Sequence, residues 1–253
     1  RLSIETSWID KIDVYMRRSG VTQATYHVGD SLPFNERPIK QRLFALDLDF
    51  EPGKSTVFIR SETPDPMVLP IYLMPVEDAT ANNILEGHGA GFVFGVILAL
   101  LAYNLMLYFS LRNDRYFFYS LYLFFSLAVI TAYTGHGFQW LWPHWPRWQL
   151  WSNPVLMVAS GISGLVFATR FLNTETEFPR LYRVVIIGSW AFIALEALAV
   201  LGDGHAWALL VAFSLITFFC VVMATLGAVS YFGGNEFAKY FLVASVVAAL
   251  SAS

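Results

Sequence analysis

The stretch GHGAGFVFGVILALLAYNLMLYFSL (Gly87–Leu111) contains no lysine, arginine, aspartate or glutamate. An α-helix needs about 20 apolar residues to cross the hydrocarbon core of a bilayer, so this stretch is long enough for one span. Four more complete apolar runs follow, and a further run continues to the last residue. We therefore expect five complete transmembrane helices and the start of a sixth, at about 87–110, 116–134, 150–171, 183–201, 206–232 and 238–253.

The residues before the first apolar run have a different composition. The whole chain is 56% hydrophobic and 14% charged, whereas soluble domains carry about 25% charged residues. Of the 19 acidic residues, 13 lie in residues 1–86, together with 9 of the 16 basic residues. The first third of the chain is therefore suited to water, and residues 87–253 are suited to a lipid bilayer.

Hydrophobic and polar residues alternate within residues 1–78, which is typical of strands with one buried face. One such face comprises Ile12, Val14 and Met16, and a second comprises Phe44, Leu46, Leu48 and Phe50. A turn at Ser19-Gly20 follows the first face, and further strands are expected at 55–60 and 68–74. We expect a partial all-β jelly-roll sandwich at 1–78, joined by a short linker at 79–86 to an all-α transmembrane bundle at 87–253.

Several function classes are disfavoured by the composition. A net charge of −3 without a basic patch argues against nucleic-acid binding. The single cysteine, Cys220, allows neither a disulfide framework nor a zinc cluster. The sequence GGNEF (Gly233–Phe237) is one letter from the GGDEF signature of diguanylate cyclases, but here it joins two apolar runs. We therefore expect no catalytic residue, no metal site and no cofactor in this segment.

The basic residues in the loops predict the orientation of the helices, because cytoplasmic loops are enriched in lysine and arginine. One set of alternate loops contains Arg112, Arg115, Arg170, Arg180, Arg183 and Lys239, and the other set contains only Arg147. The N-terminal segment is therefore expected outside the cytoplasm. An outside loop holds Trp140, Trp142, Trp145, Trp148 and Trp151, which we interpret as an interfacial anchor, with a ligand-stacking platform as the alternative.

Two features inside the membrane runs are candidates for special roles. Gly87, Gly91 and Gly95 form a small-residue stripe that favours close packing of a neighbouring helix. Glu196 is the only carboxylate within the apolar runs of the sequence. Its insertion into a membrane costs about 2.5–3.5 kcal/mol. It is expected to face the bundle or water, either locally hydrogen-bonded or as a proton or ion site.

The order of these features resembles a known family. The matching stretches include DKIDVYM (Asp10–Met16), PGKSTVFIRSE (Pro52–Glu62), YNLMLYFSLRNDRYFFYSLY (Tyr103–Tyr122) and FLNTETEFPRLYR (Phe171–Arg183). Together they are similar to the bacterial 7TMR-DISM family, seven-transmembrane receptors with diverse intracellular signalling modules. The N-terminal part is similar to the family's second type of extracellular domain, a jelly-roll related to carbohydrate-binding modules. The first sandwich strands, the seventh helix and the output module of the family pattern are expected to be missing at the two ends.

The resemblance implies a receptor in the bacterial inner membrane with a periplasmic sensor domain. Its ligand would be carbohydrate-like, and its output a cytoplasmic module in the same polypeptide, such as a diguanylate cyclase or a histidine kinase. A homodimer is compatible with this arrangement. Candidate sugar contacts are Trp8, Tyr15, Tyr26, Arg37 and Arg42, with core or rim packing as the alternative. The alternative function is a transporter or channel with Glu196 in the pathway.

The expected topology can be tested by cysteine labelling in a Cys220→Ser background. A membrane-impermeant thiol reagent should label Asp47→Cys in spheroplasts, because residue 47 lies in the segment assigned to the outside. Arg115→Cys, in the first basic loop, should react only after the membrane is permeabilised. Protection of Asp47→Cys in intact spheroplasts would reverse the orientation.

Overall fold

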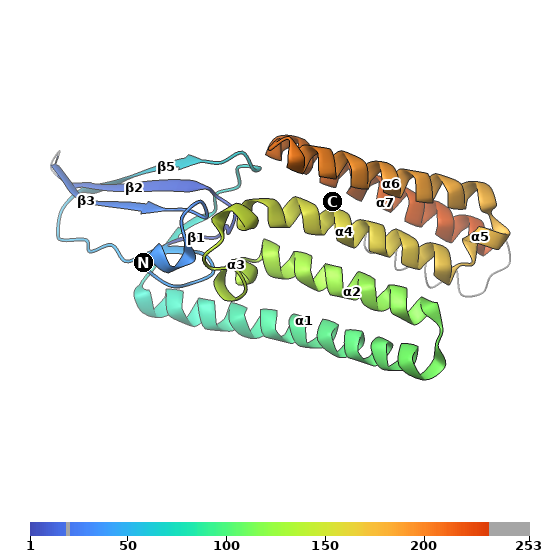
Figure 1. Cartoon of the computed structure of the whole chain (residues 1–253). Helices are drawn as coiled ribbons and strands as arrows, with labels where there is room; N and C mark the ends of the chain where they lie inside the picture. The colour runs from blue at the N-terminus through green and yellow to red at the C-terminus, as the bar shows by residue number, and fades with distance from the viewer. Residues whose placement is uncertain (19–20, 233–253) are drawn as a thin grey trace. The chain divides into compact units, whose positions relative to one another are not determined.

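The computed structural model describes residues 1–18 and 21–232 (Figure 1). The turn expected at Ser19-Gly20, the GGNEF stretch and the helix expected at 238–253 lie outside the described residues. Antiparallel strands in two small sheets come first in the chain, and long apolar helices follow. This order confirms the predicted fold class of a sheet domain followed by a helical membrane region.

Six short strands form the N-terminal domain. They are β1 (Leu2–Ile4), β2 (Lys11–Arg18), β3 (Val21–Val28), β4 (Phe44–Leu46), β5 (Ser55–Glu62) and β6 (Ile71–Leu73), with a 3-10 turn at Phe34–Glu36. One sheet has the order β4-β1-β6 and the other the order β3-β2-β5, and the neighbouring strands are antiparallel. The core between them draws on both sheets, since Ile4, Val14 and Phe44 are each at most 2% exposed.

The alternation in the sequence locates the buried faces but not the strand ends. Ile12, Val14 and Met16 are all buried on β2, as predicted. The second predicted face, from Phe44 to Phe50, is shorter in the structure. Strand β4 ends at Leu46, and Phe50 is 46% exposed. The strand expected at 68–74 is limited to Ile71–Leu73, with Pro70 before it and Pro75 beyond it. Proline has no N–H to donate to a strand ladder.

The helices are α1 (Val76–Leu111), α2 (Asp114–Tyr133), α3 (His136–Trp140), α4 (Pro146–Phe171), α5 (Thr174–Glu177), α6 (Pro179–Leu201) and α7 (His205–Phe232). Within residues 1–18 and 21–232, five of them are long and apolar enough to cross a membrane, namely α1, α2, α4, α6 and α7. They correspond to the five complete spans that the apolar runs predict.

Helix α1 begins at Val76, well before the start expected near residue 87, so the expected linker at 79–86 is helical. Pro75 precedes the helix, and Glu77 and Asp78 lie in its first turn. Acidic side chains there favour helix formation because they interact with the positive end of the helix dipole. Only residues 74 and 75 separate β6 from α1.

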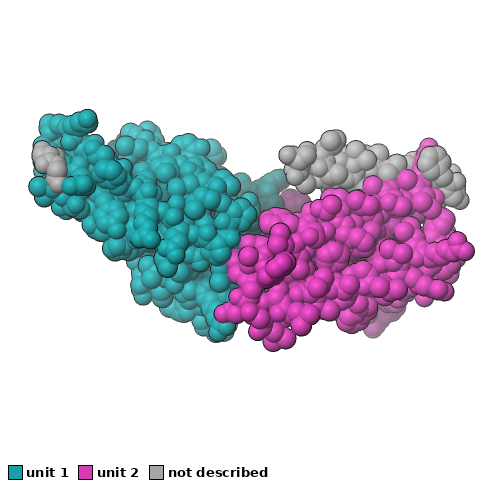
Figure 2. Space-filling view, turned by 90° about the horizontal axis from the view of Figure 1, so that it is seen from above, with its two compact units in different colours: residues 1–95, 128–153 teal, residues 96–127, 154–253 magenta. Residues whose placement is uncertain are grey.

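The chain divides into two compact units (Figure 2), one of residues 1–95 and 128–153 and the other of residues 96–127 and 154–253. The first, which we call the sensor unit, holds the sheets and one end each of α1, α2 and α4. The second, the membrane unit, holds the remaining parts of these helices with α6 and α7.

Among the described residues of the membrane unit, three glycines permit close side-chain contacts, and none of the three belongs to the predicted stripe. A Cβ built at Gly164 would lie 2.8 Å from the ring of Phe219 and 3.0 Å from that of Tyr122. Gly161 and Gly188 are similarly close to Leu215 and Phe218. By contrast, apart from the neighbouring backbone of α1 itself, no atom of the described residues lies within 4 Å of a Cβ built at Gly87, Gly91 or Gly95. Close packing against the stripe stays a prediction.

This difference predicts opposite outcomes for two matched substitutions. Gly164→Leu should destabilise the protein by about 1–3 kcal/mol, because the new side chain overpacks the site beside Phe219 and Tyr122. Gly91→Leu should not destabilise the protein, because no neighbouring element crowds the position and leucine has a higher helix propensity than glycine, by up to about 1 kcal/mol. Thermal unfolding in detergent measures both. Equal losses for the two variants would show that the stripe is also packed.

Candidate functional site

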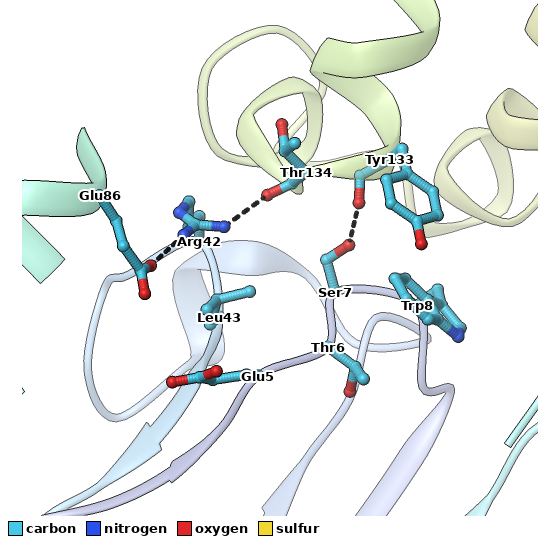
Figure 3. A pocket seen from close by; sticks show the side chains of 9 residues that line it. All are labelled: Glu5, Thr6, Ser7, Trp8, Arg42, Leu43, Glu86, Tyr133 and Thr134. Atoms are coloured by element: carbon cyan, nitrogen blue, oxygen red, sulfur yellow. Dashed lines mark hydrogen bonds and ion pairs between the residues drawn. The ribbon is translucent and has the colours of Figure 1, made fainter. Parts of the chain in front are cut away.

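An open cleft of about 250 Å³ lies within the sensor unit (Figure 3). Its walls come from parts of the chain that are far apart in sequence. Two loops of the sheet domain contribute Glu5–Trp8, directly after β1, and Arg42–Leu43, directly before β4. The helices contribute Glu86 from α1, Tyr133 at the end of α2, and Thr134 beyond it.

The turn after α2 approaches the sheet domain closely at Gly135. This residue has φ of +80°, in the left-handed region that glycine tolerates best. A Cβ at Gly135 would lie 2.9 Å from both the Arg42 carbonyl oxygen and the Ser7 Cβ. The Ser7 hydroxyl donates a 2.6 Å hydrogen bond to the Tyr133 carbonyl oxygen. The sheet loops and the end of α2 are therefore in direct contact.

Arg42 connects the sheet domain to two helices at once. Its Nη1 donates a 3.3 Å hydrogen bond to the Thr134 carbonyl oxygen, and its Nη2 forms an ion pair with Glu86 of α1 (Figure 3). The Arg42 side chain is 17% exposed and that of Glu86 is 41% exposed. A cation is favoured beside the carbonyl groups that end a helix, because the helix dipole is negative there.

Aromatic rings close the other side of the cleft. Trp8 and Tyr133 stack with ring centroids 4.9 Å apart and 25° between their planes. The Trp8 indole N–H donates a 3.2 Å hydrogen bond to the Pro66 carbonyl oxygen. This bond fixes the indole at the rim of the cleft.

Charge is not balanced in the cleft. Glu86 has Arg42 as its ion-pair partner, whereas Glu5 forms no salt bridge among the described residues. Partial burial and the negative charge of Glu86 raise the pKa of Glu5, while the positive charge of Arg42 opposes this shift. The neighbouring His136 has a lowered pKa because it is partly buried and lies near the same guanidinium.

A second contact between the sheet domain and the helical segment is centred on Arg37. This side chain is buried, and its guanidinium lies 4.9, 4.3 and 5.4 Å from the ring centroids of Phe34, Phe44 and Phe138. Phe34 also donates its backbone N–H to the Pro143 carbonyl oxygen at 2.9 Å. Burial lowers the pKa of Arg37 to about 10, so the guanidinium is still charged at neutral pH.

Asp30 is a buried carboxyl group near Arg37, with an exposed fraction of 3%. Burial raises its pKa to about 8, and the negative charges of Asp10 and Asp65 add to the shift. The charge of Arg37 and the amide side chain of Gln149, in α4, act in the opposite direction. Asp30 is therefore protonated in the folded protein at neutral pH.

The sequence candidates for ligand contact do not form one site. Trp8 and Arg42 line the cleft together, whereas Arg37 is buried and is not part of its lining. Tyr26 packs on the core of the sheet domain, and half-buried Tyr15 pairs with Phe58 of β5 in the β3-β2-β5 sheet. No sequence pattern singles out the other lining residues, which are ordinary polar or aromatic residues: Glu5, Glu86, Tyr133 and Thr134.

Glu196 belongs to the membrane unit and not to the cleft. It is 5% exposed on α6 and interacts electrostatically with His205, the first residue of α7. Neither of its carboxylate oxygens has a hydrogen-bond partner within the described part of the chain. Among residues 1–18 and 21–232, no group of three or more His, Cys, Asp or Glu residues could hold a metal ion.

Comparison with known protein families identifies both regions. Residues 1–75 match the family model described as 7TMR-DISM extracellular 2, and residues 89–253 match the one described as 7TM diverse intracellular signalling. The chain belongs to the 7TMR-DISM family. No curated protein and no solved structure matches the sequence significantly.

Membership in the 7TMR-DISM family makes the chain a multi-pass membrane receptor with an N-terminal extracellular domain. The cleft lies where the extracellular domain meets the first helices of this receptor. Its lining combines residues of the extracellular domain with residues of α1 and α2, two of the helices that can span a membrane.

The buried carboxyl group of Asp30 predicts a pH-dependent stability. Its pKa rises from 3.8 to about 8 on folding, so unfolding releases a proton between these values and the free energy of unfolding falls as pH rises through this window. The contribution of Asp30 to the fall in the free energy of unfolding is at most about 1.4 kcal/mol per pH unit. Asp30→Asn should flatten the decline of the thermal unfolding midpoint between about pH 5 and pH 8. Asp49→Asn, at an exposed position, is the control, and an unchanged slope in Asp30→Asn would contradict the assignment.

Proposed function

We propose that the chain is the sensing and membrane part of a bacterial inner-membrane receptor. In this proposal, a carbohydrate-like ligand binds the periplasmic domain and controls a cytoplasmic signalling module in the same polypeptide. Family membership supports the receptor class, and the distribution of basic residues among the loops supports a periplasmic N-terminal domain. The main observation behind the proposal is that the walls of the cleft come both from the extracellular domain and from α1 and α2.

The cleft suits a small ligand. Its volume of about 250 Å³ lies just below the range of about 300–1,000 Å³ that is typical of sites for drug-sized molecules. Trp8 offers an aromatic surface of the kind on which sugar rings stack, and Arg42 and Glu86 offer charged hydrogen-bonding groups. A monosaccharide-sized ligand is therefore consistent with the lining.

A ligand in this cleft would act by favouring one arrangement of the contacts around Arg42. It shifts an equilibrium only by as much as it binds one state better than the other, and couplings of about 1–3 kcal/mol are typical of allosteric proteins. Both α1 and α2 continue along the chain from the sensor unit into the membrane unit. A change at Glu86 or Tyr133 therefore acts on helices that also form the membrane unit.

The receptor function is favoured over a transporter or channel with Glu196 in the pathway. Transport folds typically have discontinuous helices and midplane ion sites. Here α6 is continuous from Pro179 to Leu201, and Glu196 lies near its end. The cleft, with its links to two helices, is the better supported functional site.

A charge exchange at Arg42 and Glu86 tests the coupling. In the full-length receptor with its own output module, Arg42→Glu and Glu86→Arg should each change the basal output, because each places two like charges where the ion pair now links the loop to α1. The combined variant should restore the part of the output that depends on the ion pair, since such a pair contributes about 0.2–1 kcal/mol in either polarity, but not the part that depends on the Arg42–Thr134 hydrogen bond.

Lys54→Glu is the charge control, because Lys54 lies in an exposed turn outside the cleft. It changes the net charge as Arg42→Glu does but should leave the output unaltered. Outputs that match the wild type in both single variants, at equal protein levels, would count against coupling through this cleft.

A further inference from the structure

The charges that line the cleft indicate the kind of ligand it favours. The lining contains two carboxylates, Glu5 and Glu86, and one guanidinium, that of Arg42. Arg42 is engaged with Glu86 and with the Thr134 carbonyl oxygen, while Glu5 has no ion pair in the part of the chain that the structure describes. The cleft therefore retains one uncompensated negative charge when both carboxylates are ionised.

The position of Glu5 strengthens this imbalance. Glu5 and Glu86 lie on the same side of the cleft (Figure 3), and the charge of Glu86 contributes to the raised pKa of Glu5. A cation placed at Glu5 would relieve this repulsion, whereas an anionic ligand would be repelled by both carboxylates. Like charges placed together are a means by which binding sites reject unwanted partners.

The remaining lining residues are compatible with a cation. Trp8 and Tyr133 present aromatic rings, and an ammonium group is attracted to the face of such rings by the ring quadrupole. The hydroxyl groups of Ser7 and Thr134 already donate to backbone carbonyl oxygens. The Thr6 Oγ1 atom, on a side chain that lines the cleft and is 1% exposed, has no partner among the described residues.

We propose that the cleft binds a small ligand with an ammonium group, which pairs with Glu5 while the carbon skeleton lies beside Trp8. This inference rests on the proposed function, because it takes the cleft to be the sensory site. Two classes of small ligand carry an ammonium group. An amino sugar combines it with the hydroxyl groups of a carbohydrate, and an aliphatic amine presents it without them.

Matched probes separate these possibilities in the purified full chain in detergent. D-glucosamine, D-glucose, N-acetyl-D-glucosamine and putrescine are titrated by calorimetry at about pH 6, where amines of this kind are protonated. We expect D-glucosamine to bind at least about tenfold more tightly than the two neutral sugars, because hydrogen bonds between charged groups are stronger than those between neutral groups. Binding of putrescine alone would support the ammonium contact and assign the ligand to the aliphatic amines. Equal or tighter binding of a neutral sugar, or no binding of either amine, would overturn the inference.

Substitution at Glu5 assigns the binding to the cleft. Glu5→Gln keeps the size of the side chain but removes its charge, and it should reduce amine affinity about tenfold or more. Glu36→Gln is the matched control, because Glu36 is also exposed in the sheet domain but lies outside the cleft. Unchanged amine affinity in Glu5→Gln would contradict the proposed contact. If no amine binds while the Arg42 and Glu86 exchange still alters the output, the ligand class is wrong and the receptor function stands.

Discussion

The attachment of the sheet domain to the helical segment depends on Arg42, which contacts α1 at Glu86 and the turn after α2 at Thr134. Its guanidinium is anchored on a loop of the sheet domain and bridges the Thr134 carbonyl oxygen and the Glu86 carboxylate. Neither interaction is strong alone, because partly exposed ion pairs contribute about 0.2–1 kcal/mol. That weakness suits a receptor, since a contact that must change with ligand cannot be worth much more than the coupling energy it transmits.

A second attachment around Arg37 is of a different physical kind. Arg37 is enclosed by three aromatic rings and donates to the carbonyl oxygens of Gln41 and Arg42. A buried cation is costly unless such groups replace its water, so this cluster is poorly suited to partial rearrangement. The sheet domain is therefore held to the helical segment by a buried aromatic contact near Phe138 and by a partly exposed polar contact at Arg42. The cleft lies at the polar contact.

The sequence predicts the elements of this protein better than it predicts its site. Apolar runs predict the five spans because a bilayer demands long uncharged helices, and period-two alternation locates the buried face of β2. The segment EDATANN (Glu77–Asn83) before the first run is predicted as a linker from hydropathy alone. It is helical, and its first-turn carboxylates and the preceding Pro75 favour a helix start there. Trp8 and Arg42 could be selected by residue type, but Glu5, Glu86 and Tyr133 join them only through tertiary contacts that no local pattern encodes.

The early start of α1 changes how a movement of the sheet domain is transmitted. A flexible linker at 79–86 would absorb small displacements, whereas the helical stretch from Val76 to Glu86 is about 15 Å of continuous backbone hydrogen bonding at 1.5 Å per residue. Two side-chain contacts hold this stretch to the sheet domain. The Arg1 guanidinium donates hydrogen bonds to the Asp47 carboxylate at 2.8 Å and to the Thr80 hydroxyl of α1 at 3.4 Å. Arg42 forms an ion pair with Glu86 further along the same helix. Because Glu86 is held at the far end of a stretch that is also fixed near its start, loss of the Arg42 contact alone would remove one of two attachments, while the Arg1–Thr80 contact and the packing of Phe94 on His136 and Trp140 would remain. In the proposed function, a ligand that alters the Arg42–Glu86 pair would act on a continuous helix, whereas a flexible linker would absorb the change.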